Sequence, residues 1–484
     1  MKENILVIGQ GGREHALAWK LSKSKRIQKI YICPGNGGTS LEKNIINVDL
    51  DIKNHDLLID FVKSNNINLT IVGPEDPLVN GLVNRFMEHD LKIFGPRQEF
   101  AILEGSKVFA KDFMLKNKIP TANHTMFDTL ESAKNYLQNA KYPIVVKADG
   151  LAAGKGVIIC ENKEEADSAI DKLFNSTHSN SIVIEDFLRG QELSAIYVCK
   201  RGSGTGIVLG KNRQFCLPWT KDYKSRDENN SGPNTGGMGA VSHPLCFEHK
   251  NVSFKLHLAI REVLRKTISG IDKHNNYEYQ GFLYIGLMLD SKNNINVLEY
   301  NCRMGDPETQ NLMLHLDNQE VDFYNCIEPP PLYAQWPTQP DTDLFDKVTD
   351  ENGIAKEFTE DELKDLDLRL DSDDANVFKA DDYCCTIVLA AKGYPGEYKK
   401  GFYIDISDIE ESKTLKIFHA GTTIDDNKIK VTGGRILTVN VFGKNKNEAI
   451  NLAYENIKKI KAFEDKDFKI QNQSLVFYRD DIGN

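Results

Sequence analysis

The first hundred residues alternate short apolar runs with stretches of helical periodicity, and this alternation restricts the fold more than any other feature of the chain. The apolar runs ENILVIG, KIYICPG, NLTIVGPE and LKIFGP are closed by Gly9, Gly35, Gly73 and Gly95. Strands separated by helices predict a parallel sheet with helices on both faces, the α/β class. Because ligands bind at the carboxyl edge of such a sheet, we expect the loops GQGGREH, PGNGGTS and VGPEDPL to converge on one site.

Changes in sequence texture divide the chain into four segments. Residues 1–104 form the N-terminal α/β segment, and residues 105–328 contain strand pairs and helices, with a mobile lid predicted over about 122–190. A proline-rich and then acidic stretch at 329–382 indicates a linker or an insertion. Residues 383–484 return to strands, turns and one late helix, so we expect a smaller C-terminal α+β domain.

Two helix starts are predicted from capping signals. Asp306 precedes Pro307 and the apolar run of MGDPETQNLMLHL, so we expect Asp306 to cap a helix whose first residue is Pro307. In the acidic segment, Thr359 and Glu362 form a capping box that opens a short helix at EDELKDLDLRL.

Composition limits the class of protein. A chain of 484 residues with 40% hydrophobic residues predicts a globular protein of several domains, and its short apolar start is not a signal peptide or a membrane span, which indicates a cytoplasmic location. Nine cysteines without a Cys-x-x-Cys pair indicate neither a zinc site nor a disulfide framework. The net charge of −10 is carried by residues 341–382, so the acidity of the chain says nothing about an active site. The sequence has no stripe of basic residues with interleaved aromatics, so no nucleic-acid partner is predicted.

The loop GQGGREH resembles a dinucleotide-binding motif without matching it. Glu14 stands where that motif has its third glycine, and the next strand ends at Cys33 and Pro34 with no acidic residue for a ribose. A helix N-terminus with bare amides and Arg13 beside it remains, which suits a phosphate. The alternative is a tight turn that needs small residues.

The loop KADGLAAGKGV resembles a Walker loop and also fails to match. Asp149 stands where the first glycine is required, and Lys155 is followed by Gly156 instead of serine or threonine. Apolar runs on both sides predict a glycine-rich hairpin that moves over a triphosphate and offers it backbone amides. The alternative is a mobile hairpin tip without a ligand.

The run VLEYNCR predicts a strand with a polar face. Glu299, Asn301 and Arg303 occupy alternate positions, so a regular strand places them on one side and turns Leu298, Tyr300 and Cys302 to the core. A carboxylate beside an amide oxygen suits Mg²⁺, and an arginine there suits a phosphoryl group. The alternative is an amphipathic strand with a polar outer face.

Eight motifs in one order match a known family. They are GQGGREHAL, PGNGGT, IVGPEDPLVNG, IFGP, EGSKVFAKDF, VVKADGLAAGKGV, GPNTGGMGA and LEYNCRMGDPETQ. Up to about residue 325 and again from about residue 384, the chain resembles the phosphoribosylamine–glycine ligases, also called glycinamide ribonucleotide synthetases, of the ATP-grasp superfamily. The resemblance implies that ATP, glycine and 5-phosphoribosylamine give glycinamide ribonucleotide, ADP and phosphate through glycyl phosphate, the second step of purine synthesis.

The resemblance also implies roles for individual residues. The implied ATP contacts are Lys107, Lys147, Gly154, Gly156, Glu185, Phe187, Leu188 and Glu192, and the implied ligands of Mg²⁺ or Mn²⁺ are Glu299 and Asn301. The implied acceptor-site residues are Gly11, Gly12, Arg13, Glu14, Asn36, Gly37, Thr39, Pro74, Glu75, Gly236, Gly237, Met238, Asp306 and Glu308. The implied catalytic residues are Arg303, which holds the phosphoryl group, Lys155 and Asp222.

The chain departs from the family pattern at two positions. Tyr223 stands where the family often has histidine, so no imidazole role transfers, and Asp290 is the only carboxylate offered by the preceding strand and is expected in a turn. Two rival functions stay open: another ATP-grasp carboxylate–amine ligase with a different acceptor, and a catalytically silent nucleotide-binding protein. A monomer is expected, with a dimer as the alternative, and no membrane or nucleic-acid partner.

Overall fold

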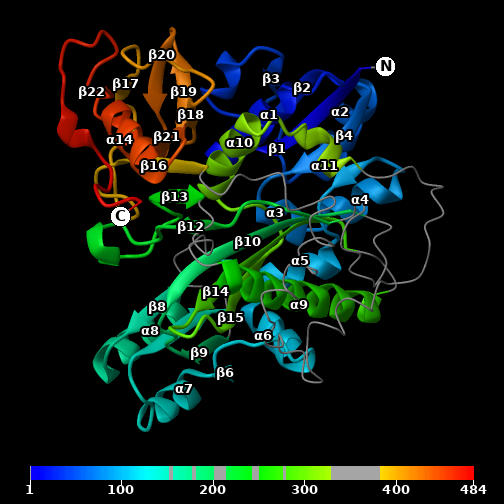
Figure 1. Cartoon of the computed structure of the whole chain (residues 1–484), viewed down its shortest axis with the longest axis vertical. Helices are drawn as coiled ribbons and strands as arrows, with labels where there is room; N and C mark the ends of the chain where they lie inside the picture. Colours follow the sequence, from blue (N-terminus) through cyan, green and yellow to red (C-terminus); the bar gives the residue numbers. More distant parts are fainter. Residues whose placement is uncertain are drawn as a thin grey trace.

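The computed structural model describes residues 2–151, 156–176, 181–200, 214–242, 250–275, 279–328 and 382–483 (Figure 1). The glycine-rich tip at 152–155 and the acidic segment therefore lie outside the described residues, as does the capping box predicted at Thr359 and Glu362. In the described part of the chain, no helix combines the length and the hydropathy that a bilayer crossing requires.

The N-terminal segment contains the predicted parallel sheet, which has five strands, one more than the four apolar runs indicated. Its strand order is β3 (Ile45–Asn47), β2 (Ile27–Pro34), β1 (Glu3–Gly9), β4 (Ile67–Val72) and β5 (Ile93–Phe94). The helices of this segment are α1 (Gly12–Ser22), α2 (His55–Ser64), α3 (Glu75–Val79), α4 (Leu82–Glu88) and α5 (Gln98–Gly105). Ile5 to Ile8 on the central strand are fully buried, which explains the continuous apolar run in the sequence.

A four-stranded antiparallel sheet forms the region predicted as a lid. Its order is β6 (His124–Phe127), β9 (Ile182–Asp186), β7 (Ile144–Ala148) and β8 (Val157–Cys160). Along the chain, α7 (Leu130–Leu137) connects β6 to β7 and α8 (Lys163–Ser176) connects β8 to β9. The predicted hairpin is confirmed, since β7 and β8 pair antiparallel from Ile144 opposite Cys160 to Lys147 opposite Val157. This unit has its own apolar core and lies at the opposite end of the molecule from the N-terminus (Figure 1).

One ten-stranded sheet joins the middle and C-terminal segments. Its main path is β15 (Ile295–Asn301), β14 (Gly281–Leu289), β10 (Gln191–Cys199), β12 (Thr220–Asp222), β13 (Gly239–Ser242), β16 (Tyr383–Ala391), β21 (Arg435–Gly443) and β18 (Leu415–His419), with β11 (Gln214–Cys216) and β23 (Val476–Phe477) beside it. The pairing of β13 with β16 crosses from the middle to the C-terminal segment. The segment expected to form a domain of its own therefore shares its sheet with the segment before it.

The remaining elements complete these layers. They are α6 (Lys107–Lys116), α9 (Lys250–Asn275), α10 (Glu308–Asn318), α11 (Phe323–Ile327), α14 (Lys446–Ile457) and the small sheet of β19 (Thr422–Asp425), β20 (Lys428–Val431), β17 (Tyr403–Asp405) and β22 (Lys461–Phe463). Helix α10 lies between the N-terminal and C-terminal segments and packs against α1 on one side and the large sheet on the other (Figure 1). It therefore holds the two segments in a fixed relation.

The predicted start of α10 is wrong. The helix begins at Glu308 with Pro307 as its N-cap, and the Asp306 side chain makes no capping hydrogen bond. Asp306 Oδ2 instead forms an ion pair with Arg435 Nη2 at 2.9 Å. Arg435 from the C-terminal segment thus binds the Asp306 carboxylate, which the local sequence pattern predicted as the cap of the helix.

Candidate active site

The turn between β1 and α1 is closed by a carboxylate. Glu14 Oε2 accepts a hydrogen bond from the Gly11 N–H at 2.7 Å and completes a capping box at the start of α1. A Cβ added at Gly9 or Gly73 would stand 2.4 or 2.3 Å from the Glu14 side chain, so glycine is required where β1 and β4 end. Glu14, which replaces the third glycine of the dinucleotide-binding motif, thus occupies the turn. A phosphate bound at this turn would lie beside the Glu14 carboxylate.

Alternating charges link this turn to the end of β15. Arg13 Nε lies 2.5 Å from Glu14 Oε1, and its Nη1 lies 3.7 Å from Glu75 Oε2. Arg303 donates from Nε to Glu75 Oε2 at 3.1 Å and pairs through Nη2 with Glu104 Oε1 at 2.9 Å. The acceptor residues predicted from the N-terminal segment and the predicted phosphoryl-binding arginine are therefore brought together.

Glu104 is a residue of this network that the sequence patterns did not single out. Its Oε2 accepts the Cys302 N–H at 2.7 Å, so one carboxylate holds both the backbone after β15 and the guanidinium of Arg303. Burial raises the pKa of Glu104 to about 7, although the charge of Arg303 opposes that rise. Its position as the first residue of EGSK was the only available signal.

The loop PGNGGT is held by its own side chains. Asn36 Nδ2 donates to Gln10 O and to His419 O, both at 2.8 Å, while its Oδ1 accepts the N–H of Gly38 and that of Thr39. The Thr39 hydroxyl is fully buried and donates to Asn36 O. These two side chains, predicted to contact the acceptor, are thus satisfied within the protein, and Gly37 also donates to the backbone of Thr422.

Lys224 lies at the centre of several predicted ligand-binding carboxylates. Its Nζ is 3.3 Å from Glu192 Oε2 and 3.3 Å from Glu299 Oε1. The charge of Lys224 lowers the pKa of Glu299 to about 2, whereas burial raises the pKa of Asp222 to about 8 and also raises the pKa of Glu308. Lys224 was not predicted, and only its place two residues after Asp222 hinted at it.

The strand β15 is irregular, which corrects part of the predicted alternation. A register shift places Glu299 opposite Gly286 but Val297 opposite Leu287, so Leu298 is an extra residue. Tyr300 and Cys302 are buried as predicted, but Leu298, expected in the core, is partly exposed, and Arg303 lies beyond the strand. Glu299 and Asn301 keep the same side of the strand.

Glu299 and Asn301 suit a divalent cation only if further oxygen ligands come from a bound phosphate or from water. Among the described residues, no group of three or more histidine, cysteine, aspartate or glutamate side chains has the arrangement of a metal site. Asp290 lies in the turn after β14, where it accepts hydrogen bonds from Asn294. Glu299 and Asn301 supply hard oxygen donors of the kind that Mg²⁺ combines with phosphate oxygens and water.

A buried lysine cluster lies where the lid meets the large sheet. Lys147 Nζ and Lys111 Nζ lie 2.9 and 3.0 Å from the same oxygen, Glu185 Oε2, while Glu185 Oε1 has no hydrogen-bond partner among the described residues. Lys111, which was not predicted, also donates to Thr121 Oγ1 at 2.7 Å, and burial lowers its pKa to about 8. The carboxylate of Glu185 is thus used within the protein, and its backbone lies in β9 between β6 and β7.

The other predicted ATP contacts surround this cluster. Lys107 Nζ donates to Gly150 O at 2.8 Å, at the base of the glycine-rich hairpin, and burial lowers its pKa. Gly156 O accepts the Ala148 N–H at 2.8 Å, whereas Gly154 and Lys155 lie outside the described residues. Half-buried Phe187 and Leu188 follow β9, and Glu192 lies near the start of β10.

The segment from Asp222 to Met238 is tied to the C-terminal segment. Tyr223, which stands where the family often has histidine, is buried. Its hydroxyl accepts the Gly483 N–H at 2.9 Å, so this side chain supports the C-terminal residues. Met238 is fully buried and its carbonyl accepts the Val388 N–H at 3.0 Å. Of the predicted acceptor glycines, Gly236 is held by the Tyr394 hydroxyl, which accepts its N–H at 3.1 Å.

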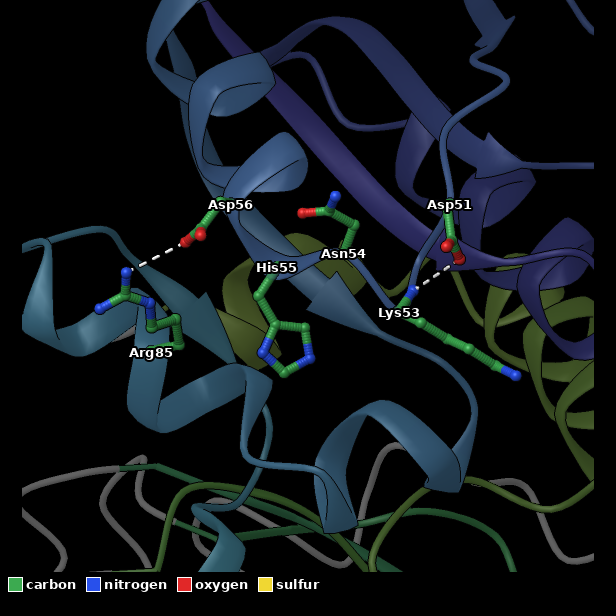
Figure 2. A pocket seen from close by; sticks show the side chains of 6 residues that line it. All are labelled: Asp51, Lys53, Asn54, His55, Asp56 and Arg85. Carbon is green, nitrogen blue, oxygen red and sulfur yellow. Dashed lines mark hydrogen bonds and ion pairs between the residues drawn. The ribbon is translucent and has the colours of Figure 1, made fainter.

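Two open hollows that are lined by described residues lie outside this site. One, of about 470 Å³, is lined by Asp51, Lys53, Asn54, His55, Asp56 and Arg85 at the start of α2 (Figure 2). Its Arg85 and Asp56 form an ion pair across the hollow at 3.0 Å (Figure 2). None of these residues belongs to the predicted site.

Comparison with known proteins covers nearly the whole chain. Models of phosphoribosylglycinamide synthetase match in three parts, the N domain at residues 3–104, the ATP-grasp (A) domain at 105–309 and the C domain at 384–484. Phosphoribosylamine–glycine ligase of Clostridium acetobutylicum is 38% identical over 99% of both chains, and that of Escherichia coli K12 is 39% identical over 93% of both.

Solved structures agree with these sequence matches. A crystal structure of phosphoribosylamine–glycine ligase from Thermotoga maritima has a TM-score of 0.70 at 29% identity and covers 99% of this chain and 100% of its own. A biotin carboxylase from Campylobacter jejuni has a TM-score of 0.64 at 12% identity over 96% of this chain and 92% of its own, which shows a shared fold alone. The chain belongs to the phosphoribosylamine–glycine ligase family of ATP-grasp proteins.

Proposed function

We propose that this chain joins glycine to 5-phosphoribosylamine at the expense of ATP and releases glycinamide ribonucleotide, ADP and phosphate. The observation that carries the proposal is the Arg303 side chain, whose guanidinium contacts Glu75 at the predicted acceptor end and Glu104 behind the predicted phosphoryl end. Full-length similarity to proteins of this name supports the same reaction, which is the second step of purine biosynthesis. The proposed location is the cytoplasm, and the proposed state is a monomer, with a dimer as the alternative.

The proposed chemistry needs no nucleophile from the protein. A carboxylate oxygen of glycine attacks the γ-phosphorus of ATP, and the bond to the leaving ADP oxygen breaks to give glycyl phosphate. The amine nitrogen of phosphoribosylamine then attacks the glycyl carbonyl carbon, phosphate leaves, and the nitrogen loses a proton. Positioning and charge neutralisation carry such a reaction.

The nucleotide half of the site is assigned as follows. In the proposed complex, Lys107 and Lys147 contact ATP phosphates, the backbone from Glu185 to Leu188 holds adenine, and Glu192 holds the ribose. Gly154, Lys155 and Gly156 are the proposed phosphate contacts from the glycine-rich segment, and the first two lie outside the described residues. Glu299 and Asn301 would hold a Mg²⁺ or Mn²⁺ ion, which would supply charge neutralisation for the phosphates. Arg303 stabilises the phosphoryl group in transfer.

The acceptor half lies at the carboxyl edge of the N-terminal sheet. In the proposed complex, the backbone amides of Gly12 to Glu14 at the start of α1 hold the ribose phosphate. Gly11 and the loop from Asn36 to Thr39, whose amides donate within the protein, line the same pocket. Pro74, Glu75 and the loop from Gly236 to Met238 complete the pocket. Asp222, Asp306 and Glu308 are the remaining proposed acceptor-side carboxylates.

One assay tests the proposed function. ADP release is measured with each amino acid in turn, with and without freshly generated phosphoribosylamine. The expected result is turnover that requires both glycine and the amine. Turnover that ignores glycine contradicts the assignment of the amino acid, and turnover without the amine points to another ATP-grasp ligase. An absence of any turnover under all conditions supports a silent nucleotide-binding protein.

A further inference from the structure

Arg435, at the start of β21, connects three separate parts of the chain. Its Nη1 donates to Gly236 O and to Asp306 O, both at 2.6 Å, and its Nη2 pairs with Asp306 Oδ2 at 2.9 Å. The side chain is 20% exposed and that of Asp306 is 17% exposed, so both groups are largely buried. One C-terminal guanidinium thus holds the middle-segment glycine loop and the carboxylate before α10.

The contacts of Asp306 fix the direction of its carboxylate. Oδ1 accepts a hydrogen bond from Gln310 Nε2 at 2.7 Å, while Oδ2 lies 3.5 Å from the point where a Cβ on Gly11 would stand. The carboxylate therefore lies directly against the turn that opens α1. Because Arg435 and Gln310 each bond one of its two oxygens, Asp306 has little freedom to turn away.

The glycine loop packs against the same short segment. Gly237 has a φ of +111°, and a Cβ added there would stand 2.5 Å from Pro307 Cδ and 3.1 Å from Asp306 O. A Cβ added at Gly236 would stand 3.0 Å from Arg435 Cζ. The loop, Asp306 and Arg435 therefore fit together without spare room, and a change in one moves the other two.

From these contacts we infer that Arg435 is a positioning residue for the amine acceptor. This inference rests on the proposed function and names a residue of the C-terminal segment that acts through Asp306 and the Gly236–Gly237 loop. Arg435 holds the Asp306 carboxylate against the α1 turn, where the ribosyl part of the acceptor binds. Its contacts with described residues are with Gly236, Gly237 and Asp306 on the acceptor side, so its loss affects binding of the amine and leaves binding of ATP and glycine unchanged.

The test compares two arginines of the C-terminal segment. Arg435→Lys keeps the charge, but a single ammonium cannot bond Gly236 O, Asp306 O and the Asp306 carboxylate together. Arg479→Lys is the matched control. The Arg479 side chain is 1% exposed, donates to Ser225 O of the middle segment at 3.0 Å and pairs with Asp481 of its own segment. Both full-length variants are assayed with ATP, glycine and freshly generated phosphoribosylamine, and melting temperatures are recorded.

The expected result is a split between substrates. Arg435→Lys raises KM for the amine, and the calorimetric Kd for the stable product glycinamide ribonucleotide, by about tenfold or more, while KM for ATP and for glycine changes by less than about twofold. Arg479→Lys lowers the melting temperature without changing KM for the amine. An unchanged amine KM in Arg435→Lys overturns the inference, and so does an equal rise in both variants, which makes the effect merely structural.

Two further measurements complete the test. Asp306→Asn removes the ion pair with little change in volume, so it shows the same rise in Kd for the product, and the double variant with Arg435→Lys shows no further rise. Additive effects in the double variant overturn the inference, and the single Asp306→Asn variant decides it if Arg435→Lys does not fold. Failure of the proposed function is recognised separately, because the unmutated protein then shows no turnover with glycine and the amine.

Discussion

Glu299 and Asn301 are the side chains of this site best suited to a divalent cation. Within the described part of the chain, the contact that competes with a cation is the ion pair of Glu299 with Lys224. We predict that Glu299→Gln with Asn301→Ala lowers Mg²⁺-dependent ADP release at least about 100-fold, because both hard oxygen donors of the strand change together. Asp290→Asn, in the exposed turn after β14, is the control and keeps its activity. A double variant that responds to Mg²⁺ like the unmutated protein removes this metal site.

The residues that the sequence identified and those that it missed differ in how far away their partners lie. Glu299 and Asn301 are placed by one strand, so the alternation of VLEYNCR was enough to put them on one side. Lys111, Glu104 and Arg435 function through partners 74, 199 and 129 positions away, at Glu185, Arg303 and Asp306. No local pattern encodes such pairs, and only folding brings them within 3.0 Å.

Local structure followed the sequence wherever one element decided it. The parallel strands that end near Gly9, Gly35 and Gly73 and the hairpin of β7 and β8 are confirmed, because periodicity and turn chemistry act within a few residues. The bulge at Leu298 was not predicted, since it arises from pairing with β14. The cap expected from Asp306 was wrong, because Arg435 competes for the carboxylate.

The loop before β13 allows a prediction at the scale of one turn. Gly237 and Gly401 both have a positive φ, but a Cβ meets Pro307 Cδ at 2.5 Å from Gly237 and nothing within 4 Å from Gly401. Gly237→Ala therefore adds overpacking to the strain that Gly401→Ala has alone, and we predict a further loss of about 1–3 kcal/mol in the free energy of unfolding. Urea unfolding of both variants measures the difference. Equal losses contradict the close packing of this loop.

At the scale of the whole molecule, the predicted segments are joined more tightly than their sequences indicate. Pairing of β13 with β16 continues one sheet from the middle segment into the C-terminal segment, and Tyr223 and Val241 belong to the same apolar core as β21 and α14. The sequence separates these strands by the acidic stretch, so composition favoured a boundary there. The acceptor half of the site consequently receives contacts from all three segments, as Asn36, Gly236 and Arg435 show.

The contact between the N-terminal and C-terminal segments should respond to acid. His15 Nδ1 accepts the His419 N–H at 2.9 Å, which requires a neutral His15 ring, and the surrounding charged groups are Glu42, Lys416 and Glu411. Burial lowers the pKa of His419 to about 3 and also lowers the pKa of His15. As the pH falls, these histidines therefore bind protons at a lower pH in the folded state than in the unfolded state. Their contribution to stability is therefore complete above the unfolded value of about 6.5 and is lost as the pH falls toward 3.

His419→Gln tests this dependence by removing one of the two buried histidines. In the unmutated protein the free energy of unfolding falls between pH 6.5 and 4, and in the variant the slope is shallower by up to about 1.4 kcal/mol per pH unit. Glu104, whose pKa burial raises to about 7, has the opposite sign, since its contribution is present below its unfolded value and is lost as the pH rises through 7. Because Glu104 titrates in both proteins, the difference between the two slopes isolates the histidine. Urea unfolding at pH 8, 6.5, 5.5 and 4.5 measures it, and parallel curves would show that the buried junction does not exclude protons from His419.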